Sequence, residues 1–359
     1  MKCIAKIALV AMGCAATLGL VSCNKKDDKT LYLYNWTYYT PDDVIAQFEK
    51  EFNCTVKVDS YASNEEMYAK LRAGAKGYDI VVPSQDYTSI MIAQGMLREL
   101  DQSKLTNRGY INPLVLEKAT YDPDMKYAVP YYFGAAGVAV NKTKATASYR
   151  RDWNIFADPQ FSGHATMMDD MREVLGDALA YQGHSVNSLD NAELQAATRH
   201  IIEEWKPHLV KFDAEGFGKS FASGDFWLCQ GYAEVIYSEV PEEKWDETID
   251  FFIPQEGGPS YLDSKIGRAS CRESMCILKD APHYELANEF INFIHRPEIY
   301  AQFLDAFRFP CFVNMEAAQY MTSKPMYEAS QMNNCELKDD LGEGLDKYNV
   351  LWQKIRFTE

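Results

Sequence analysis

The sequence has little positive charge, and after residue 22 it has no apolar run long enough to cross a membrane. Its 36 lysine and arginine residues are outnumbered by 52 aspartate and glutamate residues, for a formal net charge of −16. This balance argues against a nucleic-acid partner, because nucleic acids reward basic surfaces. It favours a cationic ligand or simply solubility. The six histidines are scattered and no cysteine pair has zinc-binding spacing, so we expect no metal site, no cofactor and no Ser/His/Asp catalytic centre.

The composition of the 359 residues is that of a globular protein, with 47% hydrophobic and 25% charged residues. This length suffices for one large domain or two medium ones. Of the nine cysteines, six lie after residue 23, and for most of these we predict buried free thiols, although an extracytoplasmic compartment would also permit a disulfide.

The first 23 residues have the pattern of a bacterial lipoprotein signal. Two lysines precede an apolar run at 7–20, which is shorter than the ~20 residues of a membrane-spanning helix. Cys23 follows at the point where a cleaved lipoprotein carries its lipid. We predict a signal peptide over 1–22 and a hydrophilic tether over 23–29. The alternatives are a cleaved signal with an ordinary cysteine, or an uncleaved anchor.

Residues 265–273 do not fit the sequence around them. They are polar and basic in an acidic protein, lack a strand or helix period, and resemble the in-frame translation of a common sequencing adapter. Residues 257–264 predict a turn leading into a strand, and residues 274–279 predict a strand. We therefore predict that 265–273 is an insertion foreign to the protein, whose removal would restore one continuous strand. The alternative is a genuine surface loop.

Alternating strands and helices predict parallel sheets with covered faces. In the first part of the chain we expect strands at 30–34, 55–58 and 79–83, and helices at 41–52 (capped by Thr40), 64–71 and 89–95. From about residue 134 onward we expect strands at 137–141, 165–168, 226–229, 235–237 and 249–254, and helices at 170–181, 189–205, 286–306 and 346–356.

Binding sites in open α/β sheets form beyond the carboxyl ends of the strands. This rule points to segments 36–39, 84–87, 169–173 and 261–263, which offer aromatic rings, carboxylates or both. An aromatic face attracts a cation by ~0.5–2 kcal/mol and shields a carbon chain, while carboxylates accept hydrogen bonds from ammonium groups. Such a pocket suits a linear polyamine.

Asp170 and Glu173 lie three apart on a predicted helix and therefore share a face. They could serve as ammonium acceptors in such a pocket. The alternative is structural: Asp169 or Asp170 caps the helix, and Glu173 lies in its favourable first turn.

Five motifs resemble those of the periplasmic spermidine/putrescine-binding proteins of ABC importers, over nearly the whole mature chain. They lie at 34–39, 63–71, 78–84, 169–174 and 256–258. The resemblance implies a two-lobed α/β periplasmic binding protein fold, each lobe a mostly parallel sheet flanked by helices, joined by crossing hinge strands and closing on ligand by a hinge motion. We expect residues 30–135 plus 260–316 to form lobe I, and 136–259 plus 317–359 to form lobe II.

The resemblance also implies which residues contact the ligand. The aromatic box would consist of Trp36, Tyr39, Tyr232, Tyr261 and Phe309. The polar contacts would come from Thr37, Ser84, Asp86, Asp170, Glu173 and Asp263, with Asp170 and Glu173 on an inner nitrogen and Asp263 on a terminal ammonium.

Three positions depart from the family pattern. Tyr38 stands where a carboxylate is common, Asp86 where spermidine-type members carry tyrosine, and Lys338 at an apparent glutamine position. Asp86 would offset the carboxylate missing at Tyr38, whereas an inward-pointing Lys338 would repel a terminal ammonium. Either Lys338 faces solvent, or the preferred polyamine is shorter, or the ligand differs.

Taken together, the resemblance implies a monomeric, non-enzymatic lipoprotein in the periplasm, held to a membrane only through lipidated Cys23. It would capture spermidine or putrescine and deliver it to an ABC permease in the cytoplasmic membrane. The alternatives are a surface sensory or adhesin lipoprotein with the same fold, and an importer component for a different cationic amine.

Overall fold

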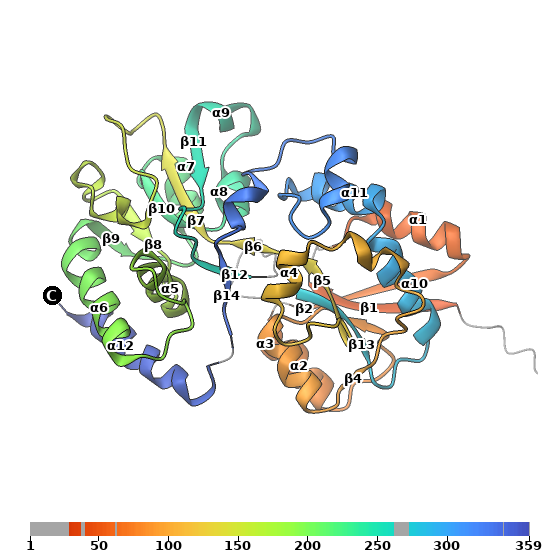
Figure 1. Cartoon of the computed structure of the whole chain (residues 1–359). Helices are drawn as coiled ribbons and strands as arrows, with labels where there is room; N and C mark the ends of the chain where they lie inside the picture. The colour runs from red at the N-terminus through yellow and green to blue at the C-terminus, as the bar shows by residue number, and fades with distance from the viewer. Residues whose placement is uncertain (1–28, 37–39, 62, 262–272, 340, 359) are drawn as a thin grey trace, which may run out of the picture.

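Two large sheets, each covered by helices, form two lobes side by side, and a small third sheet connects them (Figure 1). The computed structural model describes residues 29–36, 40–61, 63–261, 273–339 and 341–358. The arrangement is the predicted two-lobed α/β fold with crossing strands. No helix in the described ranges is both long enough and apolar enough to cross a membrane.

The first lobe is built on a sheet of order β2-β1-β3-β13-β4, with β5 also paired to β13. Its strands are β1 (Thr30–Trp36), β2 (Thr55–Tyr61), β3 (Ile80–Val81), β4 (Leu97–Arg98), β5 (Ala128–Tyr132) and β13 (Glu273–Leu278). β1 is parallel to β2 and β3, and β13 is antiparallel to β3, β4 and β5. All strands of this sheet except β13 therefore run in one direction, and in this sense the sheet is mostly parallel. Its helices are α1 (Asp42–Phe52), α2 (Asn64–Arg72), α3 (Gln85–Ala93), α4 (Pro113–Lys118), α10 (Tyr284–Ile294) and α11 (Pro297–Phe307).

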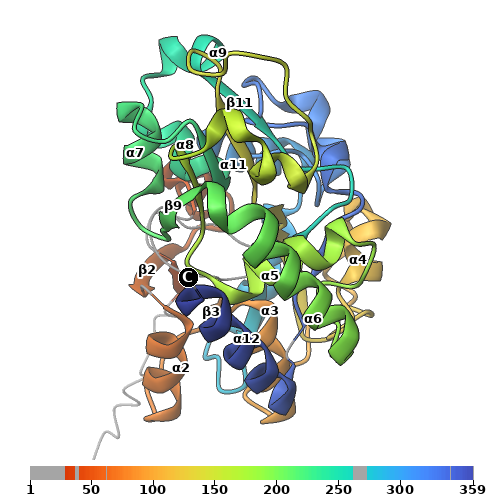
Figure 2. The same cartoon turned by 90° about the vertical axis from the view of Figure 1, so that its left-hand side faces the viewer.

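The second lobe repeats this plan with a sheet of order β11-β7-β10-β8-β9, in which β7 runs against its neighbours. Its strands are β7 (Gly137–Asn141), β8 (Ala165–Met167), β9 (Leu209–Phe212), β10 (Leu228–Gly231) and β11 (Ile249–Phe252). Its helices are α5 (Met171–Tyr181), α6 (Asn191–His200), α7 (Phe217–Ser223), α8 (Ala233–Glu239), α9 (Trp245–Thr248) and α12 (Leu345–Phe357). The last of these, α12, packs beside α5 and α6 (Figure 2).

The chain crosses between the lobes three times, and the crossings pair as β14-β12-β6. They are β6 (Gly134–Ala135), β12 (Pro259–Tyr261) and β14 (Glu336–Leu337). Gly257 leads into β12 with φ of 76°, and a Cβ there would lie 2.1 Å from the Asn334 carbonyl oxygen, so glycine is needed at this turn. The boundaries of lobes I and II, residues 30–135 plus 260–316 and 136–259 plus 317–359, remain a proposal.

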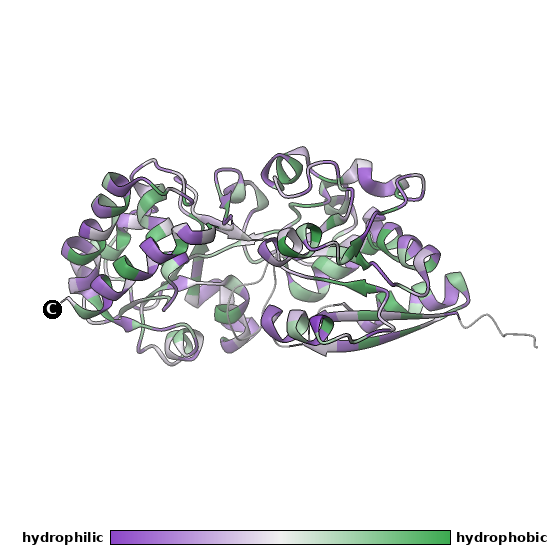
Figure 3. Ribbon diagram, turned by 90° about the horizontal axis from the view of Figure 1, so that it is seen from below, coloured by the Kyte–Doolittle hydropathy of each residue, from purple (hydrophilic) through white to green (hydrophobic). Residues whose placement is uncertain are grey.

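Apolar residues are concentrated in the strands and on the inward faces of the helices, while the outer helix faces are mostly hydrophilic (Figure 3). In α1, Val44 and Phe48 are fully buried, as the apolar stripe of this helix predicts. The ring of Phe48 lies 4.9 Å from that of Phe290 in α10. Burying one such side chain stabilises the fold by roughly 1.5–3 kcal/mol.

Three predicted elements are wrong in detail. Residues 235–237 belong to helix α8 and not to a strand, because Ala233, Ile236 and Val240 are buried at helical spacing. The helix expected at 286–306 is two helices, since Pro297 cannot continue α10 and instead starts α11. Thr40 does not cap α1; its hydroxyl accepts a hydrogen bond from Asn35 Nδ2 at 3.0 Å.

The helix expected at 89–95 begins earlier, at Gln85, with Ser84 in the N-cap position. Ser84 and Asp86 therefore belong to a helix terminus and not to a free loop. This places both residues on a defined backbone beside the second lobe.

Strands β12 and β13 pair with one stretch of backbone, residues 128–135. Tyr261 lies opposite Gly134, and Ser274 lies opposite Pro130. On the partner backbone the two pairs are four residues apart, from 134 to 130. From β12 to β13 the same two pairs are thirteen residues apart, from 261 to 274, which is an excess of nine. Residues 265–272 lie outside the described residues, and Glu273 opens β13 opposite Tyr132 with an irregular register. Counted from the Glu273–Tyr132 pair the excess is ten, so it is nine or ten residues, close to the length of 265–273. This agreement supports the proposal that the segment is an insertion.

Candidate functional site

Four of the predicted site residues lie at the carboxyl ends of strands, whereas Glu173 lies in α5 and Phe309 follows α11. Trp36 ends β1, Ser84 follows β3, Asp170 follows β8 and Tyr232 follows β10. Thr37, Tyr38, Tyr39, Asp263 and Cys23 lie outside the described residues. Of Tyr261 only the backbone is described, opposite Gly134.

Residues of both lobes line a cavity of about 400 Å³. The first lobe contributes Asp86, and the second contributes the start of α5 and the segment after β14. The charged residues that line it are Asp86, Asp169, Asp170, Asp339, Arg172 and Lys338. Four carboxylates against two cations give this cavity a net negative lining, which suits a cationic ligand.

Asp170 both caps α5 and lines the cavity. Its Oδ1 accepts hydrogen bonds from the backbone N–H groups of Arg172 (2.8 Å) and Glu173 (3.1 Å). The capping role weighed as an alternative is therefore present. The same carboxylate also faces the cavity, so the two roles do not exclude each other.

Ser84 is fully buried and supports Asp86. Its hydroxyl donates to Asp86 Oδ1 at 2.5 Å, and its backbone N–H donates to Asn64 Oδ1 at 3.1 Å. Asp86 itself lines the cavity. This hydrogen bond holds the Asp86 carboxylate against the start of α3.

Lys338 points inward. Its Nζ contacts Glu173 Oε1, and the two side chains are 3% and 0% exposed. The Tyr232 hydroxyl donates to the same Glu173 oxygen at 3.4 Å. The alternative in which Lys338 faces solvent is therefore excluded.

Asp177 lies one helical turn beyond Glu173 and is fully buried, with its Oδ2 accepting a hydrogen bond from Gln230 Nε2. Burial, followed by the charge of Glu173, raises the pKa of Asp177 well above its usual value. Asp177 was not predicted as a site residue, although its position four residues after Glu173 places the two on one helix face.

The described members of the predicted aromatic box make contacts in different places. The Trp36 indole donates to the Val82 carbonyl at 2.9 Å and its ring lies 4.5 Å from that of Tyr61. Phe309 stacks on Tyr132 at 4.0 Å. Both are first-lobe contacts, whereas Tyr232 reaches Glu173 in the second lobe. The complete box stays a prediction.

Several further cavity residues were not predicted from the sequence, among them one aromatic residue and one carboxylate. Trp352 of α12 and Asp339 line the cavity beside Asp170. Asp339 Oδ1 also accepts a hydrogen bond from Gln85 Nε2 at 3.3 Å, which links the helix α3 to the segment after β14. Neither residue follows the carboxyl end of a predicted strand, so the strand-end rule does not point to them.

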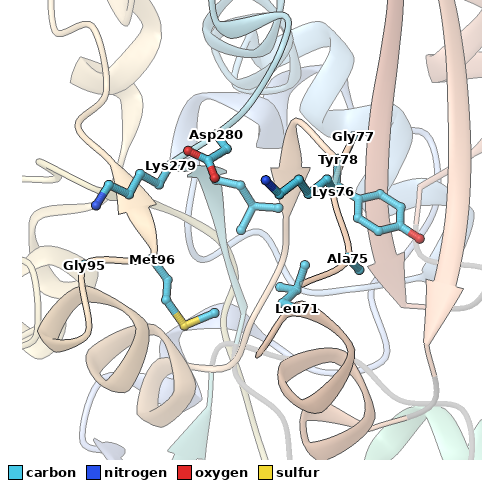
Figure 4. Close-up of a pocket in the computed structure, with 10 residues that line it drawn as sticks. Leu71, Ala75, Lys76, Gly77, Tyr78, Gly95, Met96, Lys279 and Asp280 are labelled. Atoms are coloured by element: carbon cyan, nitrogen blue, oxygen red, sulfur yellow. The ribbon is translucent and has the colours of Figure 1, made fainter. Parts of the chain in front are cut away.

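A second pocket of about 220 Å³ lies elsewhere on the first lobe (Figure 4). It has Leu71 and Met96 on one side and Lys76, Lys279 and Asp280 on the other. The segment that lines it leads into β3, whereas the acid-lined cavity lies beyond the carboxyl end of that strand. No predicted site residue lines this pocket.

The sequence profile of bacterial extracellular solute-binding proteins matches residues 43–329. The chain is 32% identical to the spermidine/putrescine-binding periplasmic protein of Escherichia coli K12, over 97% of each chain. It is 32% identical to a putrescine/cadaverine-binding protein of Pseudomonas aeruginosa, over 74% of each. The crystal structure of the TpPotD lipoprotein of Treponema pallidum is 47% identical and matches with a TM-score of 0.80, over 92% of this chain and 100% of that one.

Proposed function

The chain belongs to the bacterial extracellular solute-binding proteins, and we propose that it captures a polyamine, spermidine or putrescine, and delivers it to an ABC permease. The observation that carries this proposal is the similarity to a spermidine/putrescine-binding protein over 97% of both chains. The acid-lined cavity between the lobes supports it independently, because it supplies the anions that ammonium groups require.

Capture follows from the position of the carboxylates on both lobes. Asp86 belongs to the first lobe and Asp170 to the second, and both line the cavity. A ligand with an ammonium group at each end can bind both carboxylates at once. Because such a ligand contacts both lobes, it favours the arrangement in which the two carboxylates line one cavity.

The rest of the predicted contact set is part of the same proposal. Thr37, Tyr39, Tyr261 and Asp263 would join the described residues around the ligand, with Trp36 and Phe309 as walls. The proposal includes no catalytic step, since the family is a solute-binding component of transport.

The proposed location is the periplasm, with Cys23 lipidated as the membrane anchor and the protein monomeric. The signal pattern of residues 1–22 supports the anchor. The TpPotD relative, which is 47% identical, is itself described as a lipoprotein.

Isothermal titration calorimetry on the mature chain tests the ligand. Putrescine, cadaverine, spermidine and spermine are titrated at one ionic strength, and at least one should bind to a single site. Butylamine, which has the same carbon chain as putrescine but one ammonium, is the matched control. It should bind more weakly by roughly ten-fold or more, because one desolvated charge pair is lost. No heat with any of the four polyamines would refute the proposed function.

A further inference from the structure

The ion pair between Lys338 and Glu173 gives the acid-lined cavity a cation of its own. Lys338 lines the cavity, and its Nζ contacts Glu173 Oε1 with both side chains almost completely buried. The two opposite charges compensate each other, and removing either partner would leave an uncompensated buried charge. Glu173 is thus already neutralised by the protein.

The backbone fixes the direction of the lysine. Residue Leu337 pairs with Ser260 in the connecting sheet, and its carbonyl accepts a hydrogen bond from Asn187 Nδ2 at 2.7 Å. On the other side, the Asp339 N–H donates to Asn187 Oδ1 at 2.8 Å. Because both neighbours of Lys338 are held by one asparagine, its side chain is aimed at Glu173 by a rigid segment.

The lysine side chain is chemically a piece of a polyamine. It carries four methylene groups and a primary ammonium, the same unit as the aminobutyl arm of spermidine. We propose that Lys338 permanently occupies the position on Glu173 that a ligand ammonium would otherwise take, so that the site selects a diamine over a triamine. This inference rests on the proposed function and specifies its ligand.

The charges that remain fit a ligand with two ammonium groups. Of the four carboxylates on the cavity wall, Asp169 pairs with Arg356 at 3.4 Å, and Asp339 accepts a hydrogen bond from Gln85 Nε2 at 3.3 Å. With Glu173 neutralised, we assign the two ligand ammonium groups to Asp86 on the first lobe and Asp170 on the second. A third ammonium near Glu173 would meet the Lys338 cation in place of an anion. Like charges in a site shielded from water oppose binding, so a triamine is disfavoured by the protein itself.

Calorimetry with putrescine and spermidine on the wild-type mature chain and on Lys338→Gln tests the inference. The wild type should bind putrescine more tightly than spermidine by about ten-fold or more. K338Q exposes Glu173 to the ligand, so the ratio of the putrescine affinity to the spermidine affinity should fall by about ten-fold. The matched control is Lys118→Gln, since Lys118 Nζ donates to the Cys335 carbonyl at 2.5 Å near the same segment but does not contact Glu173. K118Q should leave the ratio unchanged.

A second variant separates the anion from the cation. In Glu173→Gln combined with Lys338→Gln, neither charge is present, so the gain for spermidine should disappear. A gain that persists in the double variant would overturn the proposed role of Glu173. Thermal unfolding establishes that each variant is folded. If K338Q does not fold, the ratio of the putrescine affinity to the spermidine affinity of the wild type tests the proposed selection, and equal affinities would refute it.

The two proposals fail in different ways. If wild-type protein binds spermidine as tightly as putrescine, and folded K338Q shows the same ratio, the role of Lys338 is refuted while polyamine capture stands. If no polyamine binds to any variant, polyamine capture itself is refuted.

Discussion

At the scale of single residues, the carboxylate of Asp170 has two roles, as the cap of α5 and as a proposed ligand contact, and a substitution can separate them. As a cap it needs only an oxygen that accepts from backbone N–H groups, and asparagine does this as well as aspartate. As a ligand contact it needs a negative charge. Asp170→Asn should therefore weaken polyamine binding by roughly ten-fold or more while changing the free energy of unfolding by less than about 0.5 kcal/mol.

The chain contains a matched control for this variant. Asp190 caps α6 with the same geometry, accepting from the N–H groups of Ala192 (2.8 Å) and Glu193 (3.1 Å). Asp190→Asn should change neither affinity nor stability. Calorimetry and urea unfolding of the two variants provide both measurements, and unchanged affinity in D170N would remove Asp170 from the ligand site.

The sequence alone places Asp170 and Glu173 on one helix because their spacing is local. It could not decide the direction of Lys338, whose partner Glu173 lies 165 positions away and is brought near only by β14 joining the connecting sheet. Such contacts are set by the path of the chain and not by the pattern of residues.

At the scale of elements, the pairing of β12 and β13 leads to a test of the proposed insertion. A chain that lacks 265–273 can continue from β12 into β13 in register with residues 128–135. Removing the intervening segment should raise the free energy of unfolding by about 1–2 kcal/mol, because less loop entropy opposes closure. Urea unfolding of the two chains measures the difference.

A chain in which residues 265–273 are scrambled is the control for this deletion, and it should match the parent in stability. Resequencing the locus gives an independent answer. A clean read through these codons, or a deletion chain less stable than its parent, would show that the segment is genuine.

Most helices and strands were predictable because their apolar periods are regular, as in α1 and β1. The failures have local physical causes. In α8, β-branched and aromatic residues suggested a strand at 235–237, but burial at helical spacing decided the outcome. Between α10 and α11, a continuous apolar pattern concealed the break at Pro297.

At the scale of the whole molecule, one buried carboxyl should make global stability fall with pH. Glu234 of α8 is 7% exposed, and within the described structure its Oε1 has no hydrogen-bond partner. Burial raises the pKa of Glu234 from 4.5 to about 7. Because the folded state binds this proton more tightly than the unfolded state, stability is lost as pH rises from 4.5 to about 7.

The substitution Glu234→Gln should remove this loss of stability with rising pH. Relative to wild type, E234Q should be more stable above pH 7 by as much as about 3 kcal/mol, and should gain little at pH 4. The exposed Glu239 on the same helix provides the control variant, Glu239→Gln, which should show no such pH dependence. Urea unfolding of the three proteins at pH 4 and pH 8 gives the comparison, and equal gains at both values would contradict the assignment.

The alternation of strands and helices predicted mostly parallel sheets, and the family resemblance predicted two lobes with crossing strands. Neither indicated that each sheet contains one reversed strand, β7 or β13, because strand direction depends on how the crossings connect the lobes. Similarly, α12 joins the second lobe beside α5 and α6, far from its neighbours in sequence.

The late position of β13 in the chain imposes an order on folding. All strands of the second sheet are complete by Phe252, whereas the first sheet lacks the strand between β3 and β4 until Leu278 has left the ribosome. During synthesis the first sheet must therefore wait for a strand made more than 140 residues after β5, while the second sheet already has all of its strands. The sheet that begins first in the chain is therefore the sheet that is completed last.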